Sequence, residues 1–551
     1  MRLVLAFVLG LAFSLAQAER ILLIPLDSRP ATGQFAQMIG KIDGVDVVMP
    51  PYEDLGRFTT PGNPDAILDW VSQQDLSDVS AVIASADMVS YGGLIASRVH
   101  TVDADKAMDR MHRLADLIRK QPNTKLYVFS ATMRLLPTAT TKASKFRLQL
   151  GLYEEQKAKY DMTSDAKAMK LAKYYKPTVP AQDIADYEST RRRNYEVQER
   201  LIRMQAHGDF DYLVLGQDDA RPFGPHVPET ERLRKLVNQL DVPSKVFFCE
   251  GVDQHACVLL SKALLAESNW EPKVRVVYSD DQGKFQFANF ESKPIKDSLA
   301  DQLAVSGATL AEPGEAYDYT LYLNTPGRRE DLFKEFVANL SSDIDHDLPT
   351  AIADIDLSGS GTSDPELFSA LWEKRRVMKL ASFAGWNTAG NTMGTAIPQA
   401  NLFLLARRTA SVDPVQRELA QREFLLHRFV NDFAYHRYTR TRAYEIIEQD
   451  HRGNPDEIYG NEYDKVNTFV QQDLSQWLGA YFQEQFLGGR FYAGTKEYAV
   501  TGLNNVKIWL PWPRPYEVRL EFTMEANPVV AQTPPPVNTA ALPPPSQVGR
   551  G

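Results

Sequence analysis

The chain has 551 residues, of which 44% are hydrophobic and 24% are charged. These proportions are ordinary for a soluble globular protein, and the length is sufficient for two or three domains. The formal net charge of −10 argues against nucleic acid or an anionic lipid surface as the main partner.

The first eighteen residues (1–18) predict a signal peptide. Arg2 precedes an apolar run that ends at Leu15, and Ala16-Gln17-Ala18 is an A-x-A cleavage signal. The run is too short to span a bilayer, and no other stretch is apolar enough for a transmembrane helix. We therefore expect an exported protein, periplasmic or secreted after cleavage near Ala18.

Residues 20–360 alternate short apolar runs with longer helical patterns, as expected for a parallel sheet covered by helices. The eight runs are ILLIPLD (21–27), AVIASAD (81–87), KLYVFSA (125–131), DYLVLGQ (211–217), KVFFCEG (245–251), VRVVYSD (274–280), YTLYLNT (319–325) and TAIADID (350–356). Their continuous hydrophobicity indicates burial on both faces of the sheet. Two further runs, at 45–50 and 380–387, leave the strand count open.

Eight β/α units predict an α/β fold built as a barrel of the triosephosphate-isomerase (TIM) type. Ten strands divided between two sheets would instead give two doubly wound α/β domains, which is the alternative. The helical pattern of the long Lys-, Arg- and Glu-rich segment at 140–207 marks it as an insertion.

The remaining segments complete the predicted organisation. An α/β domain over 19–400 is followed by a helical region over 401–490 and a small β element over 491–527. The Pro-rich stretch 528–551 is expected to be a disordered tail. The two cysteines, Cys249 and Cys257, are expected to be buried, unpaired thiols.

Polar residues follow most of the apolar runs, where the carboxyl ends of parallel strands form the usual active-site face. The candidate substrate-binding and catalytic residues at these ends are Asp27, Arg29, Asp87, Tyr91, Arg134, Gln217, Asp218, Asp219 and Asn324. Helix capping accounts for one or two such residues, but not for a cluster after nearly every strand. We predict one shared cleft, with the adjacent pair Asp218 and Asp219 as catalytic carboxylates.

The stretch GWNTAGNT (385–392) adds three candidates, Trp386, Asn387 and Asn391. We expect a loop that opens a helix whose N-terminus faces the cleft. Trp386 offers a stacking face for a sugar ring, with a buried core position as its alternative role.

Five longer motifs stand out along the chain. They are IPLDSRP (24–30), ASADMVSYGGLIASR (84–98), GQDDARPFG (216–224), LNTPG (323–327) and GWNTAGNTMGTAI (385–397). Together they resemble a bacterial family known as domain-of-unknown-function family 4127. The resemblance covers roughly residues 20–510. It implies that these polar stretches act as one set, and it implies no activity.

The GQDDA motif after the fourth run, with VFFCEG in the next run, also looks like the O-GlcNAcase type of glycoside hydrolase. This resemblance implies a TIM-type barrel in which Asp218 orients the substrate's acetamido group and Asp219 is the general acid/base. It further implies sugar contacts from Asn324, Trp386 and Asn387. The sequence departs from that family in its length, in most intervening residues and in the insertion at 140–207.

The chemistry of an adjacent carboxylate pair is consistent with glycoside hydrolysis, which needs two carboxyl groups or one carboxyl and a substrate acetamide. Asp218 and Asp219 cannot both ionise easily in a dry cleft, so their pKa values are expected to separate. Arg29 and Arg134 are suited to a carboxylate or phosphate on the ligand. Their alternative role is a salt bridge to Asp27 or Asp87.

Three functions follow from these residues. The first is an exported glycosidase that acts on amino-sugar-containing glycans without a cofactor. The second is a metal-dependent hydrolase in which Asp27, Asp87, Asp218 and Asp219 hold a divalent ion through oxygen ligands. The third is an extracytoplasmic protein whose two α/β lobes close on a small polar ligand, which a strand count divided between two sheets would favour.

Overall fold

The computed structural model describes residues 19–140, 142–357, 361–409, 412–450 and 454–529. The predicted signal peptide (1–18) lies outside the described residues. So does the predicted Pro-rich tail from residue 530 onward.

The first half of the chain forms a six-stranded parallel sheet with the strand order β2-β1-β3-β4-β5-β6. Its strands are β1 (Arg20–Ile24), β2 (Asp46–Val48), β3 (Val79–Ser85), β4 (Lys125–Thr132), β5 (Tyr212–Gln217) and β6 (Val246–Glu250). Every residue of β1 except its first is buried, and so is every residue of β5. The near-continuous apolar runs reflect this burial on both faces.

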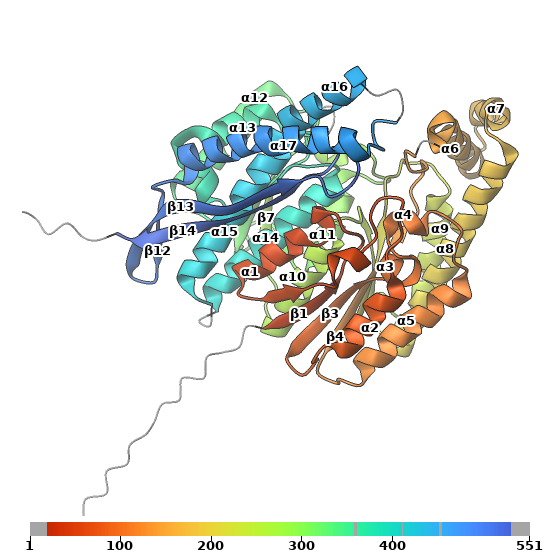
Figure 1. The fold of residues 1–551 in the computed structure, drawn as a ribbon, viewed down its shortest axis with the longest axis horizontal. Helices are drawn as coiled ribbons and strands as arrows, with labels where there is room; N and C mark the ends of the chain where they lie inside the picture. The colour runs from red at the N-terminus through yellow and green to blue at the C-terminus, as the bar shows by residue number, and fades with distance from the viewer. Residues whose placement is uncertain (1–18, 141, 358–360, 410–411, 451–453, 530–551) are drawn as a thin grey trace, which may run out of the picture.

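Helices cover both faces of this sheet and form the first lobe (Figure 1). They are α1 (Gln34–Ile42), α2 (Pro64–Gln73), α3 (Ala86–Tyr91), α4 (Leu94–Ser97), α5 (Ala104–Arg119), α6 (Arg147–Thr163), α7 (Ala166–Tyr175), α8 (Ala181–His207), α9 (His226–Gln239) and α10 (His255–Ser268). Helices α6, α7 and α8 occupy the long segment between β4 and β5. Helices α1 and α10 pack on the face toward the second half of the chain, and α2, α5 and α8 pack on the other.

A second parallel sheet of five strands follows, with the order β11-β10-β9-β7-β8. Its strands are β7 (Lys273–Tyr278), β8 (Thr309–Leu310), β9 (Tyr319–Asn324), β10 (Thr350–Asp354) and β11 (Ser382–Ala384). Its helices are α11 (Ile295–Ser306), α12 (Glu330–Asp345), α13 (Pro365–Trp372) and α14 (Ala389–Arg408). Read from β8, the strands follow the same doubly wound order as the first sheet.

The strands therefore form two open sheets, and the alternative of two doubly wound domains describes the fold. The expected barrel is not what the described residues form, because β6 and β7 belong to different sheets. Helices α10 and α14 pack against each other within one apolar core that reaches both sheets. This helical layer occupies the space where a closed barrel would continue its strand pairing.

The C-terminal part is helical and then β-stranded, and it packs on the second sheet. Its helices are α15 (Pro414–Phe429), a π-helix (Val430–Thr439), α16 (Arg440–Asp450), α17 (Gly460–Tyr481) and a second π-helical turn (Phe482–Phe486). An antiparallel sheet of β12 (Arg490–Ala493), β13 (Lys496–Trp509) and β14 (Arg519–Pro528) ends the described chain. Pro528, predicted to begin the disordered tail, is the last residue of β14 and pairs with Tyr498.

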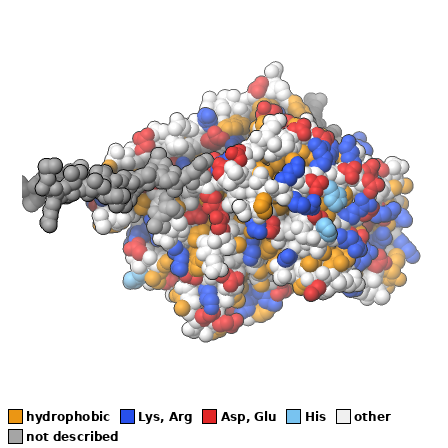
Figure 2. Space-filling view, turned by 90° about the horizontal axis from the view of Figure 1, so that it is seen from below, with side chains coloured by type: hydrophobic (Ala, Val, Ile, Leu, Met, Phe, Trp, Pro, Cys, Tyr) orange, Lys and Arg blue, Asp and Glu red, His pale blue; other side chains and the backbone are white. Residues whose placement is uncertain are grey.

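Short 3-10 helices complete the secondary structure. They lie at Pro30–Thr32, Tyr52–Asp54, Ala143–Lys145, Lys176–Thr178, Gly283–Phe285 and Glu373–Lys379. Within the described part of the chain, none of the helices is long and apolar enough to cross a membrane. Side chains of both charge signs are interspersed over the face in Figure 2. Cys249 and Cys257 are both buried and unpaired, as the sequence predicted.

Candidate functional site

A polar cavity of about 230 Å³ lies where the carboxyl ends of the first sheet meet the start of α14 and the C-terminal segment. We call it the interlobe cleft. Its charged and polar lining residues, with one Trp, are Arg29, Arg98, Arg134, Arg147, Arg514, Asp218, Asp219, Asp253, Asp456, Asn387, Asn391, Thr138, Trp512 and Tyr516. Five arginines and four aspartates thus surround one small volume.

The strand order explains why these residues meet. In an open parallel sheet, ligands bind beyond the carboxyl ends of the strands, where the connections diverge to opposite faces. In the first sheet this point lies between β1 and β3. Arg29 follows β1, Arg98 follows the short helix α4 after β3, and Arg134 follows β4.

Each member of the aspartate pair contacts an arginine. Arg98 Nη2 donates to Asp218 Oδ2, and Arg134 Nη2 donates to Asp219 Oδ2. The backbone N–H of Asp219 also donates to Asp218 Oδ1 at 2.9 Å. Only 7% of the Asp218 side chain is exposed, whereas 23% of the Asp219 side chain is, so Asp219 is the more accessible carboxyl.

The two carboxyl groups have pKa values shifted in opposite directions, as the sequence predicted for an adjacent pair. Burial raises the pKa of Asp218, but the positive charges of Arg98 and Arg134 outweigh it and leave this pKa below its ordinary value. Burial also raises the pKa of Asp219. The repulsion of Asp218 adds to burial, and together they outweigh Arg134. Asp218 is the stable carboxylate, and Asp219 is the group that more readily holds a proton.

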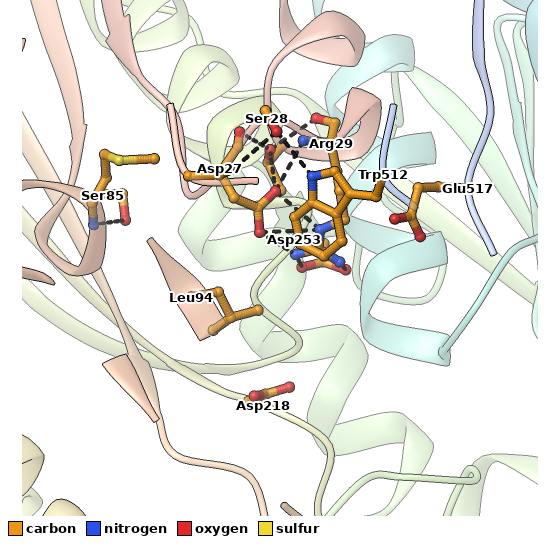
Figure 3. A network of polar contacts seen from close by, with 12 residues as sticks. Asp27, Ser28, Arg29, Ser85, Leu94, Asp218, Asp253, Trp512 and Glu517 are labelled. Carbon is orange, nitrogen blue, oxygen red and sulfur yellow. Dashed lines mark hydrogen bonds and ion pairs between the residues drawn. The ribbon is translucent and has the colours of Figure 1, made fainter. Parts of the chain in front are cut away.

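Arg29 lies between two carboxylates (Figure 3). Its Nε and Nη2 donate to Asp27, and its Nη1 and Nη2 donate to Asp253 at 2.9 and 2.7 Å. These charges raise the pKa of Arg29 although burial lowers it. Arg29 forms the salt bridge to Asp27 that was its alternative role. It also lines the interlobe cleft, where a ligand could contact it.

Several donors on the cleft wall have no partner among the described residues. Arg98 Nε and Arg134 Nε are buried and make no hydrogen bond. Arg147, from the start of α6, forms no ion pair there, and its Nε donates to the Pro137 carbonyl at 3.1 Å. Burial and the nearby charge of Arg134 lower the pKa of Arg147, and the carboxylates of Asp456 and Asp219 offset this only in part. Unpaired buried donors of this kind are costly unless something binds them.

The opposite wall of the cleft comes from the start of α14. Asn387 and Asn391 both line the cleft, and the Thr388 side chain caps the helix by accepting from the Asn391 N–H. The helix expected after GWNT therefore begins at Ala389, with its N-terminus at the cleft. Gly251 has φ +78°, and a Cβ there would lie 2.9 Å from Asn391 Oδ1. Only glycine allows Asn391 to approach so closely.

A third wall comes from the segment between β13 and β14. Arg29 lies 5.0 Å from the Trp512 ring centroid, and Trp512 Nε1 donates to Ser28 at 2.9 Å. The Tyr516 hydroxyl donates to Asn387 Oδ1 at 3.0 Å. The C-terminal β element thus completes a cleft that the first lobe begins.

Three predicted site residues from the first lobe lie behind the cleft wall. Asp87 is buried and accepts from the Ala131 N–H at 2.8 Å, which ties the end of β3 to β4. Tyr91 is buried beneath the Arg193 guanidinium. Gln217 lines a separate cavity of about 200 Å³. Gln217 ends β5, where the alternation of side chains along a strand turns it to the other side from Asp218, whereas Asp87 and Tyr91 lie on the buried helix α3.

Two further predicted site residues are buried and make contacts away from the cleft. Asn324 is fully buried in the second lobe, where its Nδ2 donates to Asp354 and Asp364 at 2.9 and 3.1 Å. Trp386 packs edge-on against Phe35 in the core, and only 6% of it is exposed. The prediction that all strand ends share one cleft therefore holds only in part for the second sheet. The end of β11 leads to Asn387 and Asn391 in the cleft, whereas Asn324 at the end of β9 is buried away from it.

The predicted metal-binding set is also divided. Asp27 pairs with Arg29, Asp87 with a backbone N–H, and Asp218 and Asp219 with separate arginines. Across the described ranges, no group of three or more His, Cys, Asp or Glu side chains is arranged to hold a metal ion. This arrangement of the carboxylates gives the metal-dependent hydrolase little support.

Several cleft residues were not predicted from the sequence. They are Arg98, Arg147, Asp456, Trp512, Arg514 and Tyr516. Asp253, which follows the fifth apolar run, belongs to the polar residues expected at the strand ends. Arg98 ends the motif ASADMVSYGGLIASR, so it had a sequence signal. The other five lie in segments where no strand end is predicted, and the sequence offers no signal for them.

A comparison with known protein families gives a match for this chain. The family described as "Protein of unknown function (DUF4127)" matches residues 21–521. The chain belongs to this family. The match extends over both lobes and includes the segment with Trp512 and Tyr516, so the whole cleft lies within the family domain. A search of curated proteins found no match.

Proposed function

We propose that this protein binds a small polar anion in the interlobe cleft. The observation that carries the proposal is a group of three arginines on one wall whose donors are only partly satisfied by neighbouring residues. Arg98 Nε and Arg134 Nε lack hydrogen-bond partners among the described residues, and Arg147 has no ion pair there. A carboxylate or phosphate matches the fork of N–H donors that arginine presents.

The architecture supports the same function. Two doubly wound lobes with a polar cleft between them are the form expected of an extracytoplasmic ligand-binding protein, the third function considered from the sequence. Export remains part of this proposal. It rests on the signal-peptide pattern of residues 1–18, which lie outside the described structure.

The remaining cleft residues define the neutral part of the ligand. Asn387 and Asn391 supply amide groups, and Asn391 Oδ1 is a buried acceptor without a partner among the described residues. Trp512 is only 1% exposed, and the guanidinium groups of Arg29 and Arg514 lie 5.0 and 4.8 Å from its ring centroid, so it supports the wall from behind. Amide groups pair with hydroxyl groups, so an acidic sugar fits this combination.

Calorimetric titration with three ligands of one ring type tests the proposal. Glucuronate and glucose 6-phosphate carry the anion, and glucose lacks it. We expect both anions to bind at least about ten-fold more tightly than glucose, since a charge-assisted hydrogen bond contributes about 1.5–3 kcal/mol. Equal affinity for all three would contradict the proposal.

A variant pair locates the binding. Arg147→Met removes a cleft cation that forms no ion pair with any described residue, so it is expected to weaken anion binding about ten-fold and to leave folding stability unchanged or higher. Arg490→Met is the matched control, because Arg490 is 62% exposed on β12 and does not line the cleft. Equal loss of affinity in both variants would place the anion elsewhere.

A second candidate function is glycoside hydrolysis of amino-sugar-containing glycans. The opposite pKa shifts of Asp218 and Asp219 favour it, because one carboxylate beside one protonatable carboxyl is the pair that such chemistry uses. Chromogenic glycosides would be screened against the wild type and Asp219→Asn. Loss of acid catalysis is expected to lower turnover by a factor on the order of 10² to 10⁴. Unchanged turnover in Asp219→Asn would rule out this role.

A further inference from the structure

A second cavity, of about 420 Å³, adjoins the interlobe cleft. We call it the side cavity. Apolar side chains that line it are Ile95, Met133, Phe146, Leu150 and Tyr187. They come from α4, from the chain after β4 and from helices α6 and α8 of the insertion.

The two cavities share part of their walls. Ile95, Arg98 and Thr138 line both of them. Arg98 Nη1 donates to Thr138 Oγ1 at 2.9 Å, while Arg98 Nη2 donates to Asp218 in the cleft. The Arg98 guanidinium therefore stands at the boundary between the polar cleft and the side cavity.

Polarity is graded across the side cavity. Ile95, Met133, Leu150 and Tyr187 are all less than 9% exposed and form its apolar inner wall. His100 and Lys142 are exposed and lie at its outer rim. An apolar inner wall next to a bound anion favours a ligand that has both kinds of group.

We propose that the side cavity receives the apolar part of the same ligand, so that the ligand is an amphiphilic anion with an alkyl or aryl group attached to its charged head. This inference rests on the proposed function. The cavity volume lies within the range of about 300–1,000 Å³ that is usual for small-molecule sites. It also gives a role to the insertion, whose helices α6 and α8 form much of the side cavity but supply only Arg147 to the cleft.

A series of straight-chain carboxylates tests the inference. Acetate, butyrate, hexanoate and octanoate share one head group and differ only in chain length. Each methylene that leaves water is expected to tighten binding about four-fold until the cavity is filled. Calorimetric titration of the wild-type protein measures the four dissociation constants.

The variant Val99→Trp tests whether the alkyl chain of the ligand lies in the side cavity. Val99 lines the side cavity but not the cleft, and it is 52% exposed, so the larger ring can obstruct the cavity without entering the core. We expect this variant to keep acetate binding and to lose the dependence on chain length. Val506→Trp is the matched control, because Val506 is 42% exposed on β13 and lines neither cavity. Ala96→Leu, which fills the same cavity with a smaller change, replaces Val99→Trp if that variant does not fold.

The outcomes separate the two proposals. If acetate and octanoate bind the wild type equally, the side-cavity inference is wrong and the anion site stands. If octanoate still binds more tightly than acetate in both Val99→Trp and Ala96→Leu, the alkyl chain of the ligand lies outside the side cavity and the inference is wrong. If no carboxylate of the series binds, this inference is wrong. The titrations with glucuronate, glucose 6-phosphate and glucose then test the anion site separately.

Discussion

Arg98 and Asp218 are 120 residues apart in the sequence and form a buried ion pair at the carboxyl edge of the first sheet. The exposed fractions of their side chains are only 6% and 7%. Arg98 comes from the end of α4 and Asp218 from the end of β5, so the pair ties together two non-adjacent connections. It also fixes the guanidinium at the boundary of the two cavities.

Removing Arg98 is therefore expected to be costly. Arg98→Met leaves the Asp218 carboxylate buried without its closest cation, and we expect a loss of about 3–5 kcal/mol in the free energy of unfolding. Lys334→Met is the control, because the Lys334–Glu330 pair is exposed and is worth less than about 1 kcal/mol. Urea unfolding measures both. Similar values for the two variants would show that the buried pair has no special importance.

The two neighbouring aspartates are expected to respond differently to the same substitution. At pH 7 the charged form of Asp218 is favoured, so Asp218→Asn should cost about 2–4 kcal/mol. Burial and the repulsion of Asp218 raise the pKa of Asp219, and relief of both offsets the lost ion pair with Arg134. Asp219→Asn should therefore change stability by no more than about 1 kcal/mol, or raise it. Melting temperatures of the two variants, compared with wild type, give the answer. A larger loss in Asp219→Asn would reverse the assignment of the pair.

The raised pKa of the buried Asp87 carboxyl is expected to make the stability of the protein depend on pH. Burial raises the pKa of Asp87 from 3.8 to about 7, so the folded state binds this proton more tightly than the unfolded state. The free energy of unfolding should therefore fall as pH rises from about 4 to about 7, by at most ~4 kcal/mol from this group. Asp87→Asn keeps an acceptor for the Ala131 N–H and should lack this contribution. Urea titrations across that range compare the two slopes, and parallel slopes would contradict the prediction.

Gly251 is expected to be needed for the cleft wall. Gly251→Ala combines a left-handed backbone angle with a Cβ within 3 Å of Gln254 and Asn391, so it should cost about 1–3 kcal/mol and weaken anion binding. Gly208→Ala is the matched control, because Gly208 has φ +92° but has nothing within 4 Å of the added Cβ. The control should lose stability only through backbone strain, by about 1 kcal/mol, and keep its affinity. Equal effects on affinity would mean that Asn391 does not depend on Gly251.

Much of the local structure could be predicted from the sequence. Each of the eight apolar runs contains a strand, and the runs at 45–50 and 380–387 contain β2 and β11. Only β8, with two residues, had no signal. Continuous apolar runs reveal buried parallel strands because burial on both faces requires hydrophobic side chains at every position.

The division into two sheets could not be read in this way. β7 starts a new sheet and does not pair with β6. The helices α10 and α14, which are far apart in the sequence, pack against each other in the core that joins the two sheets. Hydrophobic periodicity gives the faces of each element but not its partner. The eight-unit count thus favoured a barrel that the packing excludes.

The candidate site shows the same limit. The Asp218–Asp219 pair, Arg134 and the start of α14 were predictable, because polar residues at the carboxyl ends of parallel strands collect on one edge. Trp512, bonded to Ser28 across 484 residues, was not, because only the docking of the C-terminal β element brings it to the cleft. Asn324 follows the same sequence rule but ends in a buried contact with Asp354. The sequence by itself determined which residues stand at strand ends. Only the tertiary structure decided which ends meet, because the packing of the two sheets brings the end of β11 to the cleft and leaves the end of β9 buried.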